Sequence, residues 1–177
     1  MKKIFLIAIV AVLGIGSSQA QYNNWAVGFK LGEPTGLNIR KYFGDNNAID
    51  VTVGTYGGIY GNVRDYRSGR YKNVGLTVQV RYLWHKSIFN SEALKGYYGF
   101  GGQLNSRRYY FVPSSAPSSG EVYDRTISLG GTGLAGLEYF MPSSRLSLFL
   151  EAGIYAELLP AFLFLHPNMS AGVRLNL

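Results

Sequence analysis

The chain has 177 residues, a formal net charge of +7 and no cysteine, which excludes disulfides, thiolate metal sites, cysteine nucleophiles and a lipid anchor on cysteine. It contains 23 glycines and 15% aromatic residues, but only 15% of its residues are charged, against ~25% in an ordinary soluble domain. With a mean hydropathy of +0.03 it is not a bundle of membrane-spanning helices either. This combination is typical of a β-barrel that spans a lipid bilayer.

The first twenty residues are predicted to be a secretory signal peptide. Lys2 and Lys3 precede an apolar stretch at 4–15, and Ser18-Gln19-Ala20 provides small residues at a cleavage site. The apolar stretch is shorter than the ~20 residues that a spanning helix needs. We therefore expect export, cleavage after Ala20, and a mature chain that forms one barrel domain over residues 21–177.

Apolar and polar side chains alternate through the mature chain. Bulky apolar residues occupy every second position in 25–31, 48–55, 74–84, 146–154 and 169–177, and weaker repeats cover 36–43, 96–104 and 126–139. Because successive side chains of a strand point to opposite faces, each segment has one apolar and one polar face. Small or ionic residues suit a narrow lumen and bulky apolar residues suit lipid. The sequence thus predicts an all-β fold, an eight-stranded antiparallel transmembrane β-barrel.

The connections are expected to differ at the two ends of this barrel. Short connections at 44–47, 85–95 and 141–145 are assigned to the periplasmic end, and connections at 33–36, 57–73, 105–125 and 157–167 to the outer end. A girdle of aromatic residues is expected at the periplasmic interface. Its predicted members are Trp25, Phe43, Tyr82, Trp84, Tyr98, Tyr139 and Phe140.

On these patterns the mature chain resembles the small eight-stranded outer-membrane barrels of the OmpA/OmpX type. Gly32-Glu33-Pro34-Thr35-Gly36-Leu37, together with Gln21 after the cleavage site, is similar to barrels common in Bacteroidetes. The terminal Val173-Arg174-Leu175-Asn176-Leu177 resembles the signal read by the barrel-insertion machinery, although that signal usually ends in an aromatic residue. The resemblance implies the outer membrane of a Gram-negative bacterium as the location. It also implies outer-membrane lipid, lipopolysaccharide and the insertion machinery as partners.

The polar face of the predicted strands carries charges of both signs. They are Lys30, Arg40, Asp50, Arg81, Glu138, Glu151 and Arg174. Eight strands enclose an interior that side chains can fill, and buried charges persist when they are paired and hydrogen-bonded. We expect an ion-pair network that plugs the lumen, with a narrow or gated conductance through the same polar column as the alternative.

Basic and aromatic residues gather in the second and third outer connections. They are Arg64, Tyr66, Arg67, Arg70, Tyr71, Lys72, Arg107, Arg108, Tyr109 and Tyr110. Arginine presents a planar fork to phosphate, and tyrosine offers a flat amphipathic face. We expect contacts with lipopolysaccharide phosphates, with a specific ligand or protein partner as the alternative. Nucleic acid is not expected as a partner in this compartment.

The connection at 157–167 is unusually apolar for a segment that faces water. Leu158, Leu159, Phe162 and Phe164 form a candidate patch for an outer-membrane protein partner. The alternative is that the strands on either side extend into lipid.

No catalytic, cofactor or metal site is expected, and the predicted role is that of a structural or interaction protein. Residues 131–136 match the G-x-G-x-x-G pattern, but alternation follows them instead of a helix. His85-Lys86-Ser87 matches the His-x-Ser spacing of lipid A deacylases but is placed at the periplasmic end, away from lipid A. A lipid A-modifying enzyme that uses His166 is the alternative, with Glu157 to orient the ring. Otherwise both histidines are interfacial or turn residues.

Overall fold

The computed structural model describes residues 24–44, 46–59, 65–66, 69–73, 75–89, 91, 93–111 and 122–177. The predicted signal peptide and its cleavage site lie outside these ranges, as do Arg64 and Arg67. Within them the fold is all-β, and no helix is long and apolar enough to cross a membrane. The strands are β1 (Trp25–Gly32), β2 (Thr35–Phe43), β3 (Asn47–Tyr56), β4 (Asp65–Tyr66), β5 (Gly69–Asn73), β6 (Gly75–Ser87), β7 (Leu94–Phe111), β8 (Val122–Phe140), β9 (Leu146–Leu159) and β10 (Phe164–Asn176).

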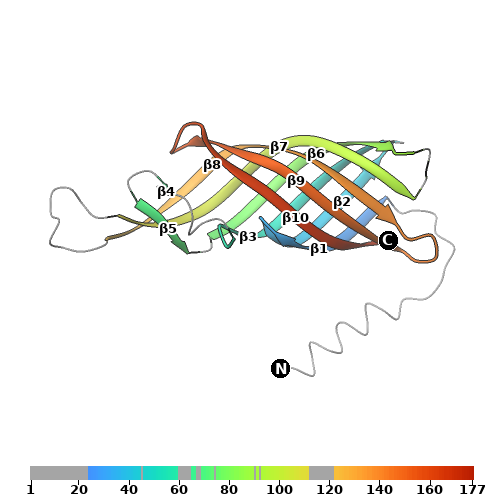
Figure 1. Ribbon diagram of the computed structural model, residues 1–177, viewed down its shortest axis with the longest axis horizontal. Coiled ribbons are helices and arrows are strands. Elements are labelled where there is room, and N and C mark those ends of the chain that lie inside the picture. The colour runs from blue at the N-terminus through green and yellow to red at the C-terminus, as the bar shows by residue number, and fades with distance from the viewer. Residues whose placement is uncertain are drawn as a thin grey trace, which may run out of the picture.

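Eight of the described strands close into an antiparallel barrel (Figure 1). Their order is β7-β6-β3-β2-β1-β10-β9-β8, and β8 pairs with β7 to complete the ring. Short β5 continues the line of β6 along β7, and β4 pairs with β5. The predicted fold class is therefore confirmed. The end that carries Asn24, Leu177 and the turns at 44–46 and 141–145 is called the terminal end, and the opposite end the loop end.

The register of the strands fixes the tilt and width of the barrel. Starting from Ala26, the path of directly paired residues runs through Arg40, Asp50, Arg81, Gly101, Thr132, Tyr155 and His166. The β1–β10 register, continued beyond its last pair, places His166 opposite position 36. The path around the barrel therefore returns about ten residues beyond Ala26, where it began, and this offset is the stagger of the strands. A stagger of this size over eight strands implies a tilt of about 40° and a radius of about 8 Å. Such an interior is narrow enough for side chains to cross.

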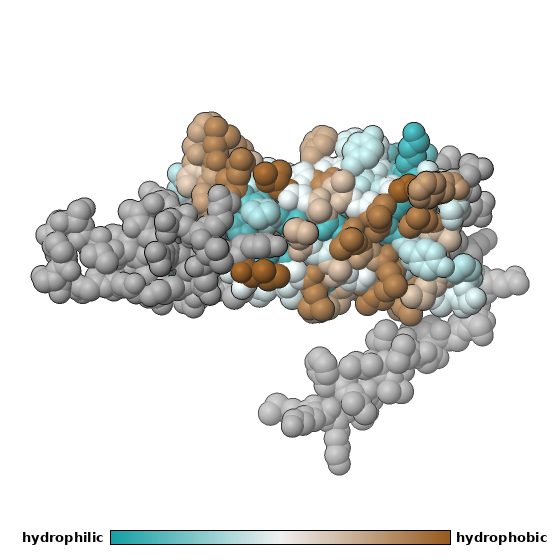
Figure 2. Space-filling model, viewed as in Figure 1, coloured by the Kyte–Doolittle hydropathy of each residue, from teal (hydrophilic) through white to brown (hydrophobic). Residues whose placement is uncertain are grey.

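The alternation predicted from the sequence is present around the whole barrel. On β6, Val78 and Val80 point outward while Gln79 and Arg81 are buried inside. Figure 2 shows the resulting apolar residues on the outer wall. Trp84 packs against Tyr82 and Tyr98 as predicted for the aromatic girdle. Half-buried Phe140 instead lies beside the ring of Tyr42 at the inner rim.

Three predicted connections are shorter than expected, because strand pairing continues past the residues that were taken as loops. β7 and β8 run to Phe111 and from Val122, so the predicted connection at 105–125 is mostly strand. β9 and β10 likewise leave only 160–163 as a turn, instead of 157–167. β6 extends to Ser87, so His85 is a strand residue and not a turn residue. Its pairing with Tyr97 keeps the ladder intact through that position.

Gly101 and Gly102, which are neighbours on β7, differ in the space that is available for a side chain. A Cβ on Gly101 would collide with the carbonyl oxygen of Val80 and lie 2.7 Å from the Cα of Arg81, whereas a Cβ on Gly102 would meet nothing within 4 Å. The β6 backbone therefore occupies the space that a side chain at position 101 would need.

We predict that Gly101→Ala lowers the free energy of unfolding by about 1–3 kcal/mol, because the two strands must separate to admit the methyl group. Gly102→Ala is the matched control and should change it by less than ~0.5 kcal/mol. Urea unfolding of the refolded barrel in vesicles measures both. Equal effects of the two variants would contradict the close approach of β6 and β7.

Candidate functional site

A cluster of charged side chains crosses the lumen in the half of the barrel nearer the terminal end. It is called the lumen network, and its members are Lys30, Arg40, Asp50, Arg81, Glu138, Glu151 and Arg174. All seven residues are at most 3% exposed. Each comes from a different strand, and β7 supplies the hydroxyl of Tyr97, which donates to Glu151 Oε1 at 2.8 Å. Every strand of the barrel thus contributes one group.

Arg40 hydrogen-bonds to all three carboxylates of the lumen network. Its Nε lies 3.0 Å from Asp50 Oδ2, its Nη1 lies 2.8 Å from Glu138 Oε2, and its Nη2 lies 3.2 Å from Glu151 Oε1. A guanidinium has five N–H donors in a fixed plane, so one arginine can bind three carboxylates from β3, β8 and β9 at once. Arg40 therefore joins walls of the barrel that are far apart in the sequence.

Arg174 and Arg81 complete the coordination of the same carboxylates. Arg174 donates from Nη1 to Glu138 Oε1 at 2.9 Å and from Nη2 to Glu151 Oε1 at 3.1 Å. Arg81 donates to Asp50 Oδ1 and, at 3.2 Å, to Glu151 Oε2. Because each buried carboxylate contacts at least two cations, the cost of removing it from water is offset by several charge-assisted hydrogen bonds.

Two aromatic rings support the arginines inside the lumen. The Cζ of Arg40 lies 4.5 Å from the centroid of Tyr97, and the Cζ of Arg174 lies 3.5 Å from the centroid of Phe149. Glycines leave the room for these rings: a Cβ on Gly136 would lie 2.6 Å from Tyr97 Cζ, and a Cβ on Gly172 would lie 2.5 Å from Phe149 Cζ. Part of the high glycine content therefore serves to fit aromatic rings into a narrow lumen.

Neutral polar side chains fill the lumen on the loop-end side of the network. Gln103 accepts from Gln79 and from Asn168, and it donates to Asn105 at 2.8 Å. Asn105 in turn accepts from Thr77 at 2.7 Å. This second layer carries no formal charge and continues the hydrogen-bonded filling of the interior.

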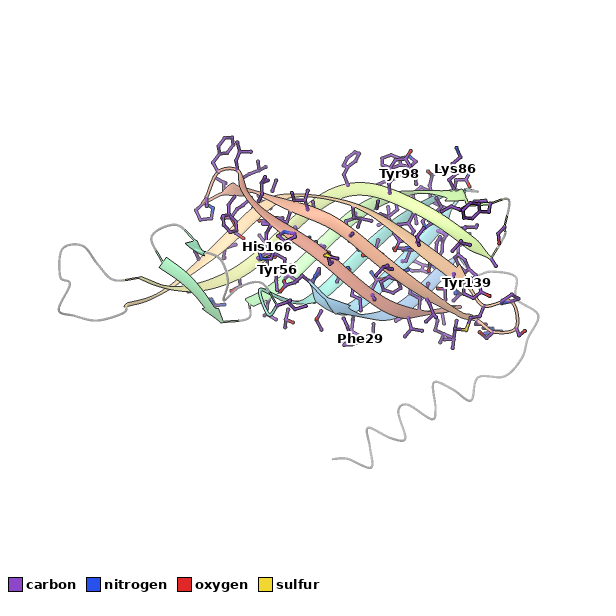
Figure 3. All side chains as sticks on the ribbon, in the orientation of Figure 1. Phe29, Tyr56, Lys86, Tyr98, Tyr139 and His166 are labelled. Atoms are coloured by element: carbon purple, nitrogen blue, oxygen red, sulfur yellow. The ribbon has the colours of Figure 1, made fainter. Side chains whose placement is uncertain are left out.

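Both histidines face the interior. His166 is 1% exposed, with its ring centroid 4.9 Å from that of Tyr56 and its Nδ1 2.9 Å from the carbonyl oxygen of Pro167 (Figure 3). Glu157, the residue proposed to orient it, accepts from the backbone N–H of Ala161 at 3.1 Å. His85 places Nε2 3.3 Å from Arg40 Nη1. The structure therefore places both rings inside the barrel wall, away from lipid.

The basic and aromatic residues of the predicted loops are only partly placed. Arg107, Arg108, Tyr109 and Tyr110 belong to β7, Arg70, Tyr71 and Lys72 to β5, and Tyr66 to β4, while Arg64 and Arg67 lie outside the described residues. β5 pairs with β7 in this region, which brings the two groups of residues onto adjacent strands. The backbone thus joins two predicted loop clusters into one region at the loop end.

The predicted apolar patch is rearranged around the turn at 160–163. Leu158, Leu159 and Phe162 are exposed, but Phe164 is half-buried, with its ring centroid 6.4 Å from that of His166. Leu163 and Leu165, which the prediction omitted, are exposed in its place. The exposed set is called the hairpin patch, and its members are Leu158, Leu159, Phe162, Leu163 and Leu165.

Sequence reasoning brought the seven charged residues together but missed the neutral groups that bind them. Tyr42 and Ser147 donate to Glu138 at 3.1 Å and 2.7 Å, and Asn38 donates to Asp50 at 2.9 Å. Each lies at an inward position of its strand, so alternation alone could have found it. Among the described residues no group of three or more His, Cys, Asp or Glu side chains is placed to hold a metal ion.

Comparison with solved structures finds similar chains. The chain is similar to the crystal structure of Neisserial surface protein A (NspA), with 14% sequence identity and a TM-score of 0.49, over 86% of this chain and 93% of that chain. The sequence matches no protein-family model and no curated protein.

We predict that Arg40→Met lowers the free energy of unfolding by about 3–5 kcal/mol, because it leaves three buried carboxylates short of a cation. Lys41→Met is the matched control, since Lys41 is the next residue on β2, faces outward and lies 5.1 Å from the Trp25 ring. Its effect should stay below ~1 kcal/mol. Urea unfolding in vesicles measures both, and comparable losses in the two variants would argue against the network.

Proposed function

We propose that this protein is an integral outer-membrane barrel with a plugged lumen, which acts as a structural or interaction protein and not as an enzyme. The observation that carries the proposal is the lumen network, because its paired charges reach across an interior of only about 8 Å radius. A lumen crossed by mutually bound side chains has no continuous water column for ions or solutes. The activity then resides on the outer surface and at the two ends.

The outer wall supports a position in a bilayer. Apolar side chains such as Phe29, Leu150 and Val80 are 44–57% exposed on three different strands. Exposure of so many apolar side chains is unfavourable in water but favourable in contact with lipid. The rings of Tyr82, Trp84 and Tyr98 form a contiguous outer cluster near the terminal end, where an interfacial aromatic belt would lie. Secretion through the predicted signal peptide agrees with this location.

Conductance tests the plug most simply. Reconstituted wild-type protein should give no discrete conductance steps in a planar bilayer, because the lumen network closes the path. A variant with both Arg40→Ala and Glu138→Ala removes one cation and one anion from the network and should conduct. The alternative, a narrow channel, predicts steps in the wild type that Arg81→Ala changes. Wild-type steps of that kind would overturn the proposal.

The β9–β10 hairpin is proposed to rest in the outer leaflet of the membrane. Figure 2 shows the hairpin as an apolar projection from the wall. Its outward side chains continue the apolar column of Ile154 and Leu150 below it without a charged residue.

We predict that a tryptophan placed at the hairpin is quenched by lipids brominated in their acyl chains. The experiment compares Phe162→Trp with Phe89→Trp, each in a Trp25→Phe, Trp84→Phe background. Phe89 is the matched control because it is 92% exposed in a turn at the terminal end. Position 162 should be quenched strongly and position 89 weakly. If position 162 is not quenched, the hairpin patch stands clear of lipid, and the result favours the alternative, a contact surface for a protein partner.

A lipid A-modifying activity through His166 is not supported by its surroundings. Its ring is packed against Tyr56 within the lumen, so an acyl chain in the membrane would have to pass through the barrel wall to reach it. Contacts between lipopolysaccharide phosphates and the basic residues of β5 and β7 remain the proposed role of that region. Arg70 and Tyr110 pair directly in the β-ladder there, so the two sets of residues lie on adjacent strands.

A further inference from the structure

The terminal end of the barrel contains a cavity of about 520 Å³, on the side of the lumen network that faces the short turns. It is lined by Asn24, Trp25, Tyr42, Gly44, Asn46, Asn47, His85, Ser87, Lys95, Phe140 and Asn176. Its volume lies within the ~300–1,000 Å³ of small-molecule sites. We propose that this cavity binds a sugar that carries a carboxylate group.

The lining combines amide side chains with aromatic rings. Four of the eleven lining residues are asparagines, and an amide can donate to one hydroxyl and accept from its neighbour on a sugar ring. Tyr42 lies beside His85 and Phe140, with ring centroids 5.5 Å and 6.5 Å apart, and these rings give one wall an aromatic face. Aromatic faces suit the C–H surface of a pyranose as they suit other flat amphipathic groups.

The charge of the lining selects an acidic ligand. Lys95 is the one Lys, Arg, Asp or Glu residue among the described lining residues, and its Nζ lies 5.7 Å from the ring centroid of Phe140. Behind this wall the lumen network contains four cations and three carboxylates, all already bound to one another. A carboxylate on the ligand would therefore meet one available ammonium group and no opposing carboxylate in the lining.

Two buried polar atoms of the lining are left without a hydrogen-bond partner among the described residues. His85 Nε2 faces the guanidinium of Arg40 at 3.3 Å, and because a guanidinium can only donate, Nε2 accepts and the proton lies on Nδ1. That Nδ1 has no acceptor. Asn176 donates from Nδ2 to the carbonyl oxygen of Arg145 at 3.0 Å, which leaves its Oδ1 as an acceptor with no donor.

A buried donor or acceptor without a hydrogen-bond partner lowers the stability of the fold by about 1–3 kcal/mol. One is a donor and one an acceptor, and both residues are at most 6% exposed at the wall of the cavity. A polyhydroxylated ligand offers both kinds of partner. Both atoms are buried behind the cavity wall, so binding lowers this cost when the side chain of His85 or Asn176 rotates toward the ligand. The chemistry of the ligand follows from the lining alone. Its source in the periplasm rests on the proposed orientation of the barrel.

The experiment compares two sugars that differ only in the carboxylate. Methyl glucuronide and methyl glucoside are titrated into isotope-labelled full-length mature protein in lipid nanodiscs, and chemical shifts of the lining residues are followed by NMR. Both sugars should give saturable shifts at Asn176 and Asn47. The acidic sugar should bind about three- to fivefold more tightly, the range expected for one partly exposed ion pair. Acetate alone should not saturate in the same concentration range.

Two variants separate the site from general charge effects. Lys95→Ala should abolish the preference for the acidic sugar while leaving the weaker binding of the neutral one. Lys86→Ala is the matched control, since Lys86 lies on β6 at the same end but is exposed on the outer side (Figure 3). It should leave the preference unchanged. Equal affinity of the two sugars for the wild type, absence of saturable shifts, or loss of the preference in both variants would overturn the proposal.

Discussion

Four cations and three carboxylates meet in the lumen of this barrel, and the rest of the structure depends on their mutual binding. Each comes from a different strand, so the network constrains the ring as a whole and not one pair of neighbours. Burial of charge is costly unless every group is paired. A shift of any strand by one residue would turn its charged side chain toward the outer wall and leave its partners unpaired. The network therefore specifies the register of the whole ring.

The outward and the inward side chains of the barrel strands both constrain the sequence. The stagger of the strands makes the interior narrow, so bulky groups such as Tyr97 and Phe149 fit only where glycine faces them from the next strand. Outside, the same strands present exposed leucine, valine and isoleucine. One alternating pattern thus produces an interior of bound charges and rings and an exterior suited to lipid.

Alternation was sufficient to predict the fold and to place the seven charged residues inside, because the direction of a side chain depends only on the parity of its position in a strand. It could not show which groups meet. Arg40 contacts Glu138 and Glu151 across the barrel, at sequence separations of 98 and 111, and those contacts depend on the stagger that only cross-strand pairing sets. The sequence therefore predicted which residues face the lumen, but not which of them form hydrogen bonds and ion pairs with one another.

The predictions that were wrong concern the positions at which strands end. Residues 157–159 and 164–167 belong to the connection predicted at 157–167. Pairing between β9 and β10 nevertheless includes Glu157 and 164–167, and Leu159 pairs with Leu129 of β8. His85 begins the connection predicted at 85–95, yet it pairs with Tyr97 and faces Arg40. Local composition marks where a chain is able to turn, whereas the length of a strand depends on whether its neighbour continues beside it.

Exchange of the arginine side-chain protons with solvent tests the proposed plug of the lumen most directly. In lipid nanodiscs the Nε–H groups of Arg40, Arg81 and Arg174 should give separate NMR signals that persist after transfer to D₂O, because each donates to a buried acceptor. The exposed Arg125 serves as the internal reference and should exchange at once. Exchange of the three lumen arginines as fast as that of Arg125 would show a water-filled lumen and contradict the account.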